Sequence, residues 1–231
     1  MSQEIGSLNE GSLHAALKDW YARPGDQLEV PVEGYFVDIV RADLLVEIQT
    51  RSFSSIKAKL LDLAERHRLR LVYPVAREKW IVKLSGEGPT PSSRRKSPKR
   101  GAFEDLFAEL VSFPRLLANP NFALEVLLTQ EEEIRRHDPK RAWRRRGWVT
   151  HDRRLLRVVD RRLFETPDQV AALLPAGLAE PFSTSDLAHG LGKPRRLAQR
   201  MAYCLREMGV IRQVGKQGNA ILYTQIGASS P

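Results

Sequence analysis

The chain has 231 residues, 42% of them hydrophobic and 28% charged, so it can bury a sizeable core in two or three domains and is not a disordered polymer. It has no run of about 18 apolar residues, no basic and apolar N-terminal segment typical of a secretory signal, and one cysteine, which excludes an internal disulfide framework. These features favour a cytoplasmic protein without a membrane span. The net charge of +9 favours nucleic acid as a partner over anionic lipid.

A helix and a strand are the first predicted elements. Residues 12–21 place Leu13, Leu17 and Trp20 near one helical face, and an Arg-Pro-Gly-Asp segment ends this helix. Residues 28–33 alternate apolar and acidic side chains, which predicts a strand. Its proline indicates an edge position or a bulge.

Residues 34–53 predict two strands joined by a tight turn after Arg41. Pairing across this turn would bring Asp38 of the first strand close to Glu47 of the second. Two carboxylates held close together repel each other unless a cation lies between them, and a divalent cation suits such a pair. The alternative is two solvated side chains paired with Arg41 or Arg51. The apolar sequence around both carboxylates favours the metal site.

These strands resemble those of the PD-(D/E)xK nuclease superfamily. Val-Asp-Ile-Val from residue 37 and Val-Glu-Ile-Gln-Thr-Arg from residue 46 are similar to motifs of Holliday-junction resolvases. The resemblance covers roughly residues 13–83. It implies that Asp38 and Glu47 bind Mg²⁺ or Mn²⁺, with Gln49 where the superfamily usually has lysine. It also implies an extra carboxylate ligand, and the candidates, each of which is alternatively a solvated charge, are Glu10, Glu29 and Glu33.

A helix is predicted from Ser54, as its N-cap, to about Arg66. Lys57 and Lys59 lie in its first turns. Some nucleases of the superfamily carry the active-site lysine on this helix, so the resemblance implies that Lys57 or Lys59 replaces what Gln49 lacks. The alternative is that both are ordinary surface lysines.

The rest of the first half completes the predicted core. Residues 69–75 and 80–84 predict two strands, and the order helix, three strands, helix, two strands matches the superfamily. The core is therefore expected to occupy residues 1–84. Residues 85–101, rich in Gly, Ser, Pro and basic side chains, are expected to form a linker or loop.

Residues 102–175 are interpreted as a basic, mainly helical middle region. Its expected elements are a helix over 103–117, a strand-like but ambiguous apolar segment at 122–128, a hairpin over 148–159 turning at His151-Asp152, and a helix over 167–174. Arginines interleaved with tryptophans near its centre suit phosphate contacts and base stacking. The alternative is a solvated face paired with the acidic residues 131–133. The expected nucleic-acid contacts are Arg51 in the core and Arg144, Arg145 and Arg146 in the middle region.

Residues 176–231 predict a capped helix over 182–192, a basic helix over 193–208 and a hairpin over 211–223 with a glycine-containing turn. This order resembles a winged helix-turn-helix, which implies that the second helix enters a DNA groove and the hairpin meets the backbone. The implied contacts are Arg196, Arg200, Tyr203 and Lys216. The alternative is a winged helix that binds protein.

The expected fold is therefore α/β with a mixed sheet: a restriction-endonuclease-like core, a mainly helical region and a winged helix domain. The expected function is a Mg²⁺-dependent endodeoxyribonuclease of DNA repair, recombination or defence, acting on duplex or branched DNA, as a monomer or homodimer, with no other small-molecule cofactor. The alternatives are a non-catalytic DNA-binding regulator and an RNA-processing nuclease. The candidate catalytic residues are Asp38, Glu47, Gln49, Lys57 and Lys59.

Overall fold

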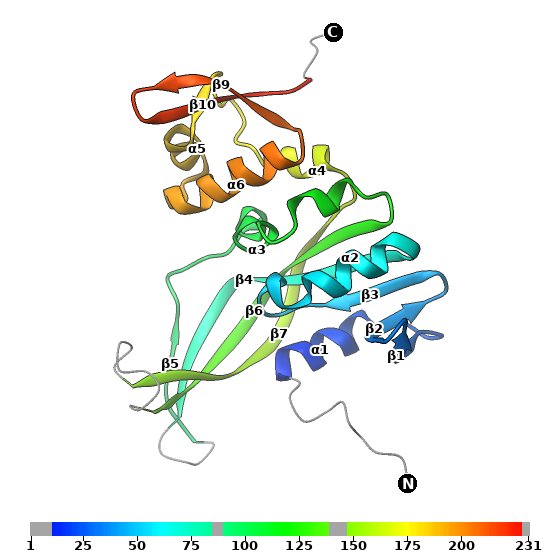
Figure 1. Ribbon diagram of the computed structural model, residues 1–231. Coiled ribbons are helices and arrows are strands. Elements are labelled where there is room, and N and C mark those ends of the chain that lie inside the picture. The colour runs from blue at the N-terminus through cyan, green and yellow to red at the C-terminus, as the bar shows by residue number, and fades with distance from the viewer. Residues whose placement is uncertain (1–10, 85–89, 139–146, 228–231) are drawn as a thin grey trace.

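The computed structural model describes residues 11–84, 90–138 and 147–227. Among these residues, seven strands form one mixed sheet in the order β1-β2-β3-β4-β6-β7, with β5 paired to β4 (Figure 1). The expectation of an α/β chain with a mixed sheet is confirmed. The strands of this large sheet are β1 Gln27–Val32, β2 Tyr35–Arg41, β3 Leu44–Ile48, β4 Arg68–Leu84, β5 Pro91–Lys96, β6 Phe122–His137 and β7 Trp148–Phe164.

The predicted hairpin is formed by β2 and β3, which pair antiparallel with Ile39 opposite Val46. The chain then crosses over through helix α2 (Lys57–Arg66) to β4, which pairs parallel to β3, as a parallel pair requires a crossover connection. The short 3₁₀ turn η2 (Phe53–Ile56) precedes α2. The predicted N-cap was wrong, because the side chain of Ser52 accepts the hydrogen bond from the backbone N–H of Ser54.

Helices cover both faces of the sheet around β2 and β3. Helix α1 (Ser12–Tyr21) packs Leu13 and Leu17 against Val46 and Ile48 on one face. Helix α2 packs Leu60, with its neighbours, into the larger cluster on the other face. This two-sided burial explains why the strands read as nearly continuous apolar runs.

Strand β4 is a single strand of 17 residues, whereas two strands separated by a gap were expected. It contains Pro74, which cannot donate a hydrogen bond to a neighbouring strand. The carbonyl of Val72 accepts the N–H of Gln49, and Pro74 points to the same side because it lies two residues further along. Strand β3 has ended at Ile48, so the missing N–H of Pro74 leaves no pairing position empty.

The segment expected to be a linker contains strand β5, which pairs antiparallel to β4 from Trp80 to Leu84. The expected helix over 103–117 is divided into the 3₁₀ turn η3 (Phe103–Leu106), helix α3 (Phe107–Leu110) and the 3₁₀ turn η4 (Pro114–Ala118). Pro114 begins η4, which is consistent with the restriction that a proline places on the residue before it.

The middle region is not mainly helical, because β6 and β7 are long strands of the large sheet. Strand β6 pairs parallel to β4 and antiparallel to β7. No hairpin turns at His151-Asp152, because β7 runs without a break from Trp148 to Phe164. The sheet therefore extends from β1 to residue 164 and is not confined to residues 1–84.

The C-terminal unit follows the predicted order of elements. Its elements are α4 Pro167–Ala171, β8 Phe182–Ser183, α5 Thr184–Leu191, α6 Arg195–Glu207, β9 Ile211–Gln217 and β10 Ala220–Gln225. Ser183 caps α5 by accepting from the N–H groups of Ser185 and Asp186, and Gly192 ends the helix in the left-handed conformation with φ of 59°. The three strands pair in the order β8-β10-β9.

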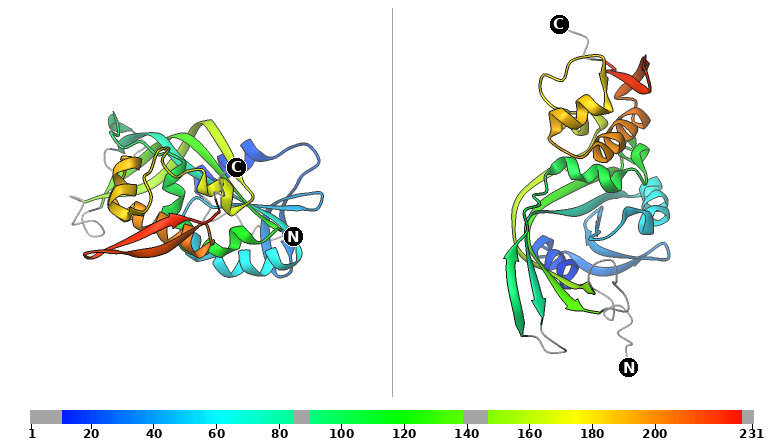
Figure 2. Two further views of the ribbon diagram at one scale, coloured as in Figure 1. Left: turned by 90° about the horizontal axis from the view of Figure 1, so that it is seen from above. Right: turned by 90° about the vertical axis from the view of Figure 1, so that its left-hand side faces the viewer.

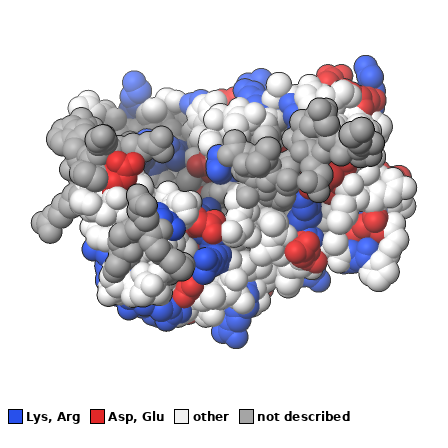
Figure 3. All heavy atoms as spheres, turned by 90° about the horizontal axis from the view of Figure 1, so that it is seen from below, with Lys and Arg blue, Asp and Glu red and all other residues white. Residues whose placement is uncertain are grey.

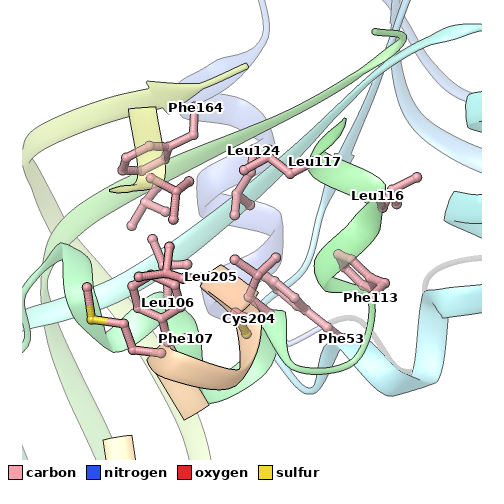
Figure 4. Packing of buried hydrophobic residues seen from close by; sticks show 14 of the residues in the cluster. Phe53, Leu106, Phe107, Phe113, Leu116, Leu117, Leu124, Phe164, Cys204 and Leu205 are labelled. Carbon is pink, nitrogen blue, oxygen red and sulfur yellow. The ribbon is translucent and has the colours of Figure 1, made fainter. Parts of the chain in front are cut away.

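This unit shares a hydrophobic core with the rest of the chain. Leu205 of α6 packs toward Leu106 and Phe107, and Cys204 lies near Phe53 (Figure 4). The two parts are stacked along the long axis of the molecule, with η3, α3 and η4 between the large sheet and α6 (Figure 2). Among the described residues, no helix is long and apolar enough to cross a bilayer.

Candidate functional site

The two motif carboxylates lie on neighbouring strands, Asp38 on β2 and Glu47 on β3. Ile39 and Val46 are paired in the antiparallel register, so their chain neighbours Asp38 and Glu47 occupy the next pair of positions along the two strands. The Oδ2 atom of Asp38 accepts a hydrogen bond from the backbone N–H of Ile48 at 2.7 Å. This bond fixes the Asp38 carboxylate against β3, next to Glu47.

A lysine from helix α2 lies next to the Glu47 carboxylate. The Nζ atom of Lys59, in α2, lies 2.6 Å from Oε2 of Glu47 and 2.5 Å from the carbonyl oxygen of Phe36. The Glu47 residue is only 8% exposed, so its carboxylate has little contact with water. Of the two lysines proposed from the sequence, the structure brings Lys59 to the carboxylates and leaves Lys57 exposed at the start of α2.

Sequence reasoning missed His14 of α1. Its Nε2 atom lies 3.2 Å from Oδ2 of Asp38. In the sequence His14 follows the apolar residue Leu13, and no spacing signal links it to a strand more than twenty residues away. The site thus gathers side chains from α1, β2, β3 and α2.

The electrostatics of the two carboxylates differ. Burial, followed by the charge of Asp38, raises the pKa of Glu47 to about 7 against the opposing effect of Lys59. Burial would also raise the pKa of Asp38, but the hydrogen bond with His14, the charge of His14 and the N–H of Ile48 hold that pKa below its usual value. The pair therefore favours one charged carboxylate and one that exchanges a proton near neutral pH.

The structure does not place Gln49 in this group. Its side-chain amide donates to the carbonyl of Ser52 and to Oγ of Ser55, and its Oε1 accepts the N–H of Arg51. The side chain of Gln49 therefore orders the loop between β3 and η2.

Glu33 also lies away from the other predicted ligands. It occupies the turn between β1 and β2, five residues before Asp38, or roughly 15 Å at the rise of an extended strand. Its carboxylate contacts His67 at 3.0 Å and Arg66 at 3.5 Å. The expectation that Glu33 joins Asp38 and Glu47 at one metal is not supported by this placement. Of the other two acidic candidates, Glu10 lies outside the described residues and Glu29 contacts Lys18 at 2.5 Å.

Asp38 and Glu47 provide hard oxygen donors of the kind that Mg²⁺ prefers, and Mg²⁺ commonly uses only one or two carboxylates and keeps several waters. The repulsion that raises the pKa of Glu47 would be relieved by a cation between the two carboxylates. Within the described ranges, no group of three or more His, Cys, Asp or Glu side chains is gathered closely enough to form a metal centre. Asp38 and Glu47 would therefore be the protein ligands of a Mg²⁺ ion bound here, with water completing its coordination.

The predicted nucleic-acid contacts are scattered over the molecule. Arg51 is exposed in the loop after β3, and Arg144, Arg145 and Arg146 lie outside the described residues. On the C-terminal unit, Arg196 and Tyr203 of α6 and Lys216 of β9 are exposed. Arg200 is instead partly buried and donates to the carbonyl of Ala108 at 2.7 Å, which ties α6 to α3.

Residues 11–165 match the profile of a protein family described as a domain of unknown function, DUF8091. The chain belongs to the DUF8091 family. A Treponema pallidum (strain Nichols) protein described as uncharacterized is 34% identical over 221 residues, which are 95% of this chain and 86% of that protein. No solved structure matches the chain.

The DUF8091 match ends one residue after the end of β7, so the family domain contains the whole large sheet. His14, Asp38, Glu47 and Lys59 all lie within it. The Treponema similarity extends further, through most of the C-terminal unit, so both parts occur together in this relative.

Proposed function

We propose that this DUF8091 protein is a metal-dependent nuclease that hydrolyses phosphodiester bonds of DNA. The observation that carries the proposal is the position of Lys59, whose ammonium group lies 2.6 Å from Glu47 beside Asp38. Two carboxylates and an amine from α2, in this order of elements, resemble a PD-(D/E)xK site whose lysine has moved from the strand to the helix.

Each side chain has a definite task in this proposal. A divalent cation bound by Asp38 and Glu47 would polarise the scissile phosphate and lower the pKa of a bound water. Lys59 stabilises negative charge that develops on the phosphate, because its ammonium is held in a poorly hydrated position. His14 and the N–H of Ile48 hold the Asp38 carboxylate in one orientation. Gln49 maintains the loop and does not take the role of the lysine.

The C-terminal unit supports DNA as the partner. Its order α4-β8-α5-α6-β9-β10 resembles a winged helix. In α6, the apolar side chains of Leu197, Met201 and Leu205 are buried, and the opposite face is exposed. That exposed face carries Arg195, Arg196, Gln199, Tyr203 and Arg206. Arginines next to a tyrosine on an exposed helix suit contacts with phosphates and bases.

One observation favours a second function, a non-catalytic DNA-binding regulator. In the described residues the carboxylate of Glu47 is paired with Lys59, and no three-ligand cluster is present. A site whose charge is already balanced from within the chain needs no metal for stability.

The proposal is tested by incubating the protein with duplex, single-stranded and branched DNA and with RNA, in Mg²⁺, Mn²⁺ or EDTA. We expect metal-dependent cleavage that is lost in Asp38→Asn and Glu47→Gln. The matched control is Glu33→Gln, which removes a carboxylate from the turn between β1 and β2 and should leave cleavage unchanged. DNA binding without cleavage under every metal condition would establish the regulator instead, and cleavage confined to RNA would make the protein an RNA nuclease.

A further inference from the structure

A pocket of about 210 Å³ is lined by residues at the ends of β4 and β6, on β5 and near the start of β7. These parts of the strands lie at the end of the large sheet far from the C-terminal unit (Figure 1). Val82, Leu84 and Ile134 line its apolar part and form a small cluster separate from the main core. Arg94, Arg154 and His151 are among the residues that line its polar part. This pocket is not part of the site formed by Asp38 and Glu47.

The pocket is built from one row of residues across four strands. Val82 of β4 pairs with Arg94 of β5 on one side and with Ile134 of β6 on the other. Ile134 in turn pairs with Asp152 of β7. Residues two apart on a strand share a face, so Leu84 and Arg154 extend the same surface. Rigid strands therefore hold an apolar floor and arginine side chains together.

The carboxylates of the pocket already have partners. Glu132 accepts a hydrogen bond from Arg94 at 2.7 Å. Asp152 accepts from Oγ of Ser12 at 2.6 Å, and Arg154 approaches it only to 4.0 Å. The side chains of Arg94 and Arg154 are 49% and 63% exposed, so both guanidinium groups reach solvent at the rim.

Helix α1 connects this pocket to the candidate site. Ser12, its first residue, hydrogen-bonds to Asp152 in the wall of the pocket. His14, two residues further along the same helix, contacts Asp38. Ser12 and His14 both lie in the first turn of α1, so the N-terminal turn of this helix contacts the wall of the pocket and the candidate site.

We propose that this pocket holds one unpaired nucleotide of a nucleic-acid strand that extends from the candidate site. The base lies on the floor of Val82, Leu84 and Ile134, and Arg154 and Arg94 contact the adjoining phosphate. A volume of about 210 Å³ is below the range of whole small-molecule ligands, which suits one base and not a complete cofactor. The substrate class is thus DNA with an unpaired segment, such as an overhang or a flap, which deepens the proposed function and rests on it.

On the lower face of the molecule, the described residues that Figure 3 shows carry basic and acidic side chains side by side. Attraction by net charge alone would therefore give little selectivity here. The apolar floor is what distinguishes an unpaired base from the stacked bases of a blunt duplex, since only an unstacked base exposes its face.

The test measures binding without cleavage, by fluorescence anisotropy in EDTA. The probes are a labelled hairpin with a single-stranded overhang and the same hairpin with a blunt end. Arg154→Ala removes a pocket arginine, and Arg157→Ala removes an exposed arginine of the same strand that does not line the pocket. We expect Arg154→Ala to weaken overhang binding about tenfold and blunt binding less than twofold, with Arg157→Ala affecting both probes by less than twofold.

A second variant tests the floor. Val82→Trp fills the pocket, and circular dichroism establishes that the variant remains folded. We expect it to abolish the preference for the overhang. Equal effects of Arg154→Ala and Arg157→Ala, or an unchanged preference in a folded Val82→Trp protein, would overturn the proposal. Overhang preference in a protein that cleaves no substrate would leave the pocket assignment standing while the nuclease proposal fails.

Discussion

Lys59 of α2 and Glu47 of β3 form an ion pair at 2.6 Å in which the side chains are 15% and 10% exposed. Lys59 belongs to the helix that connects β3 to β4. The crossover that allows these two strands to run parallel therefore also places an ammonium group beside Glu47. Because Asp38 repels Glu47 and Lys59 attracts it, the charge state of these three groups affects the stability of the fold.

The first prediction concerns stability against pH. The pKa of Glu47 is raised to about 7, so the stability that this group contributes is full below its ordinary pKa and is lost as the pH rises through about 7. Glu47→Gln does not titrate. Its stability relative to wild type should therefore increase between about pH 5 and pH 8, by up to on the order of 2–3 kcal/mol. Urea unfolding at several pH values measures this change, and parallel curves for the two proteins would contradict it.

The second prediction separates the two lysines of α2. Lys59→Met removes the ammonium beside Glu47 and should lower metal-dependent cleavage by about 10²–10³-fold. Lys57→Met, in the same helix but exposed, should change it by less than about twofold. Single-turnover rates with saturating protein report this difference. Equal rates for both variants would exclude Lys59 from the reaction.

The third prediction concerns a buried carboxylate outside both sites. Burial tends to raise the pKa of Glu133, but hydrogen bonds from Lys79 and Arg135 lower it to about 2. Its stabilisation is present above its ordinary pKa and is lost as the pH falls toward 2. Glu133→Gln should cost about 1–3 kcal/mol at pH 7, a range reduced because both cations are partly exposed, and roughly half of that at pH 3, where the folded-state carboxylate is still mostly charged. Chemical denaturation at the two pH values measures the loss, with Glu104→Gln, in the η3 turn, as a control.

The fourth prediction tests the shared core. A chain that ends after residue 175 loses α6 and exposes Leu106 and Phe107, which are fully buried in the complete protein. We expect this truncated protein to aggregate or to unfold at a markedly lower temperature than the full chain. In the full chain, Leu205→Ala should cost about 2–5 kcal/mol, and unfolding should remain a single transition by calorimetry. A stable, monodisperse truncated protein would show that the two parts fold independently.

The hairpin, α1, α2 and the C-terminal elements could be predicted because each carries a local signal. Period-two or helical spacing marks their buried faces, and Ser183 and Gly192 mark the ends of α5. The placement of Asp38 beside β3 followed from strand pairing alone. The selection of Lys59 over Lys57 did not, because it depends on how α2 is rotated against the sheet.

The middle region could not be predicted for a different reason. Buried on both faces, β6 reads as an apolar run that does not distinguish strand from helix. Its pairing with β4 joins residues more than fifty positions apart, which no short sequence window detects. The contribution of His14 and the row of residues that forms the pocket share this origin, since both arise from contacts across the fold.

The docking of α6 on α3 has a consequence for the evolution of the chain. The DUF8091 match ends at residue 165, yet the apolar cluster continues past it into α6. Two modules joined only by a tether can be exchanged by recombination, because neither depends on the surface of the other. Here a replacement module would have to cover Phe107 and satisfy the carbonyl of Ala108, as Arg200 does. The C-terminal unit is therefore expected to be inherited together with the sheet.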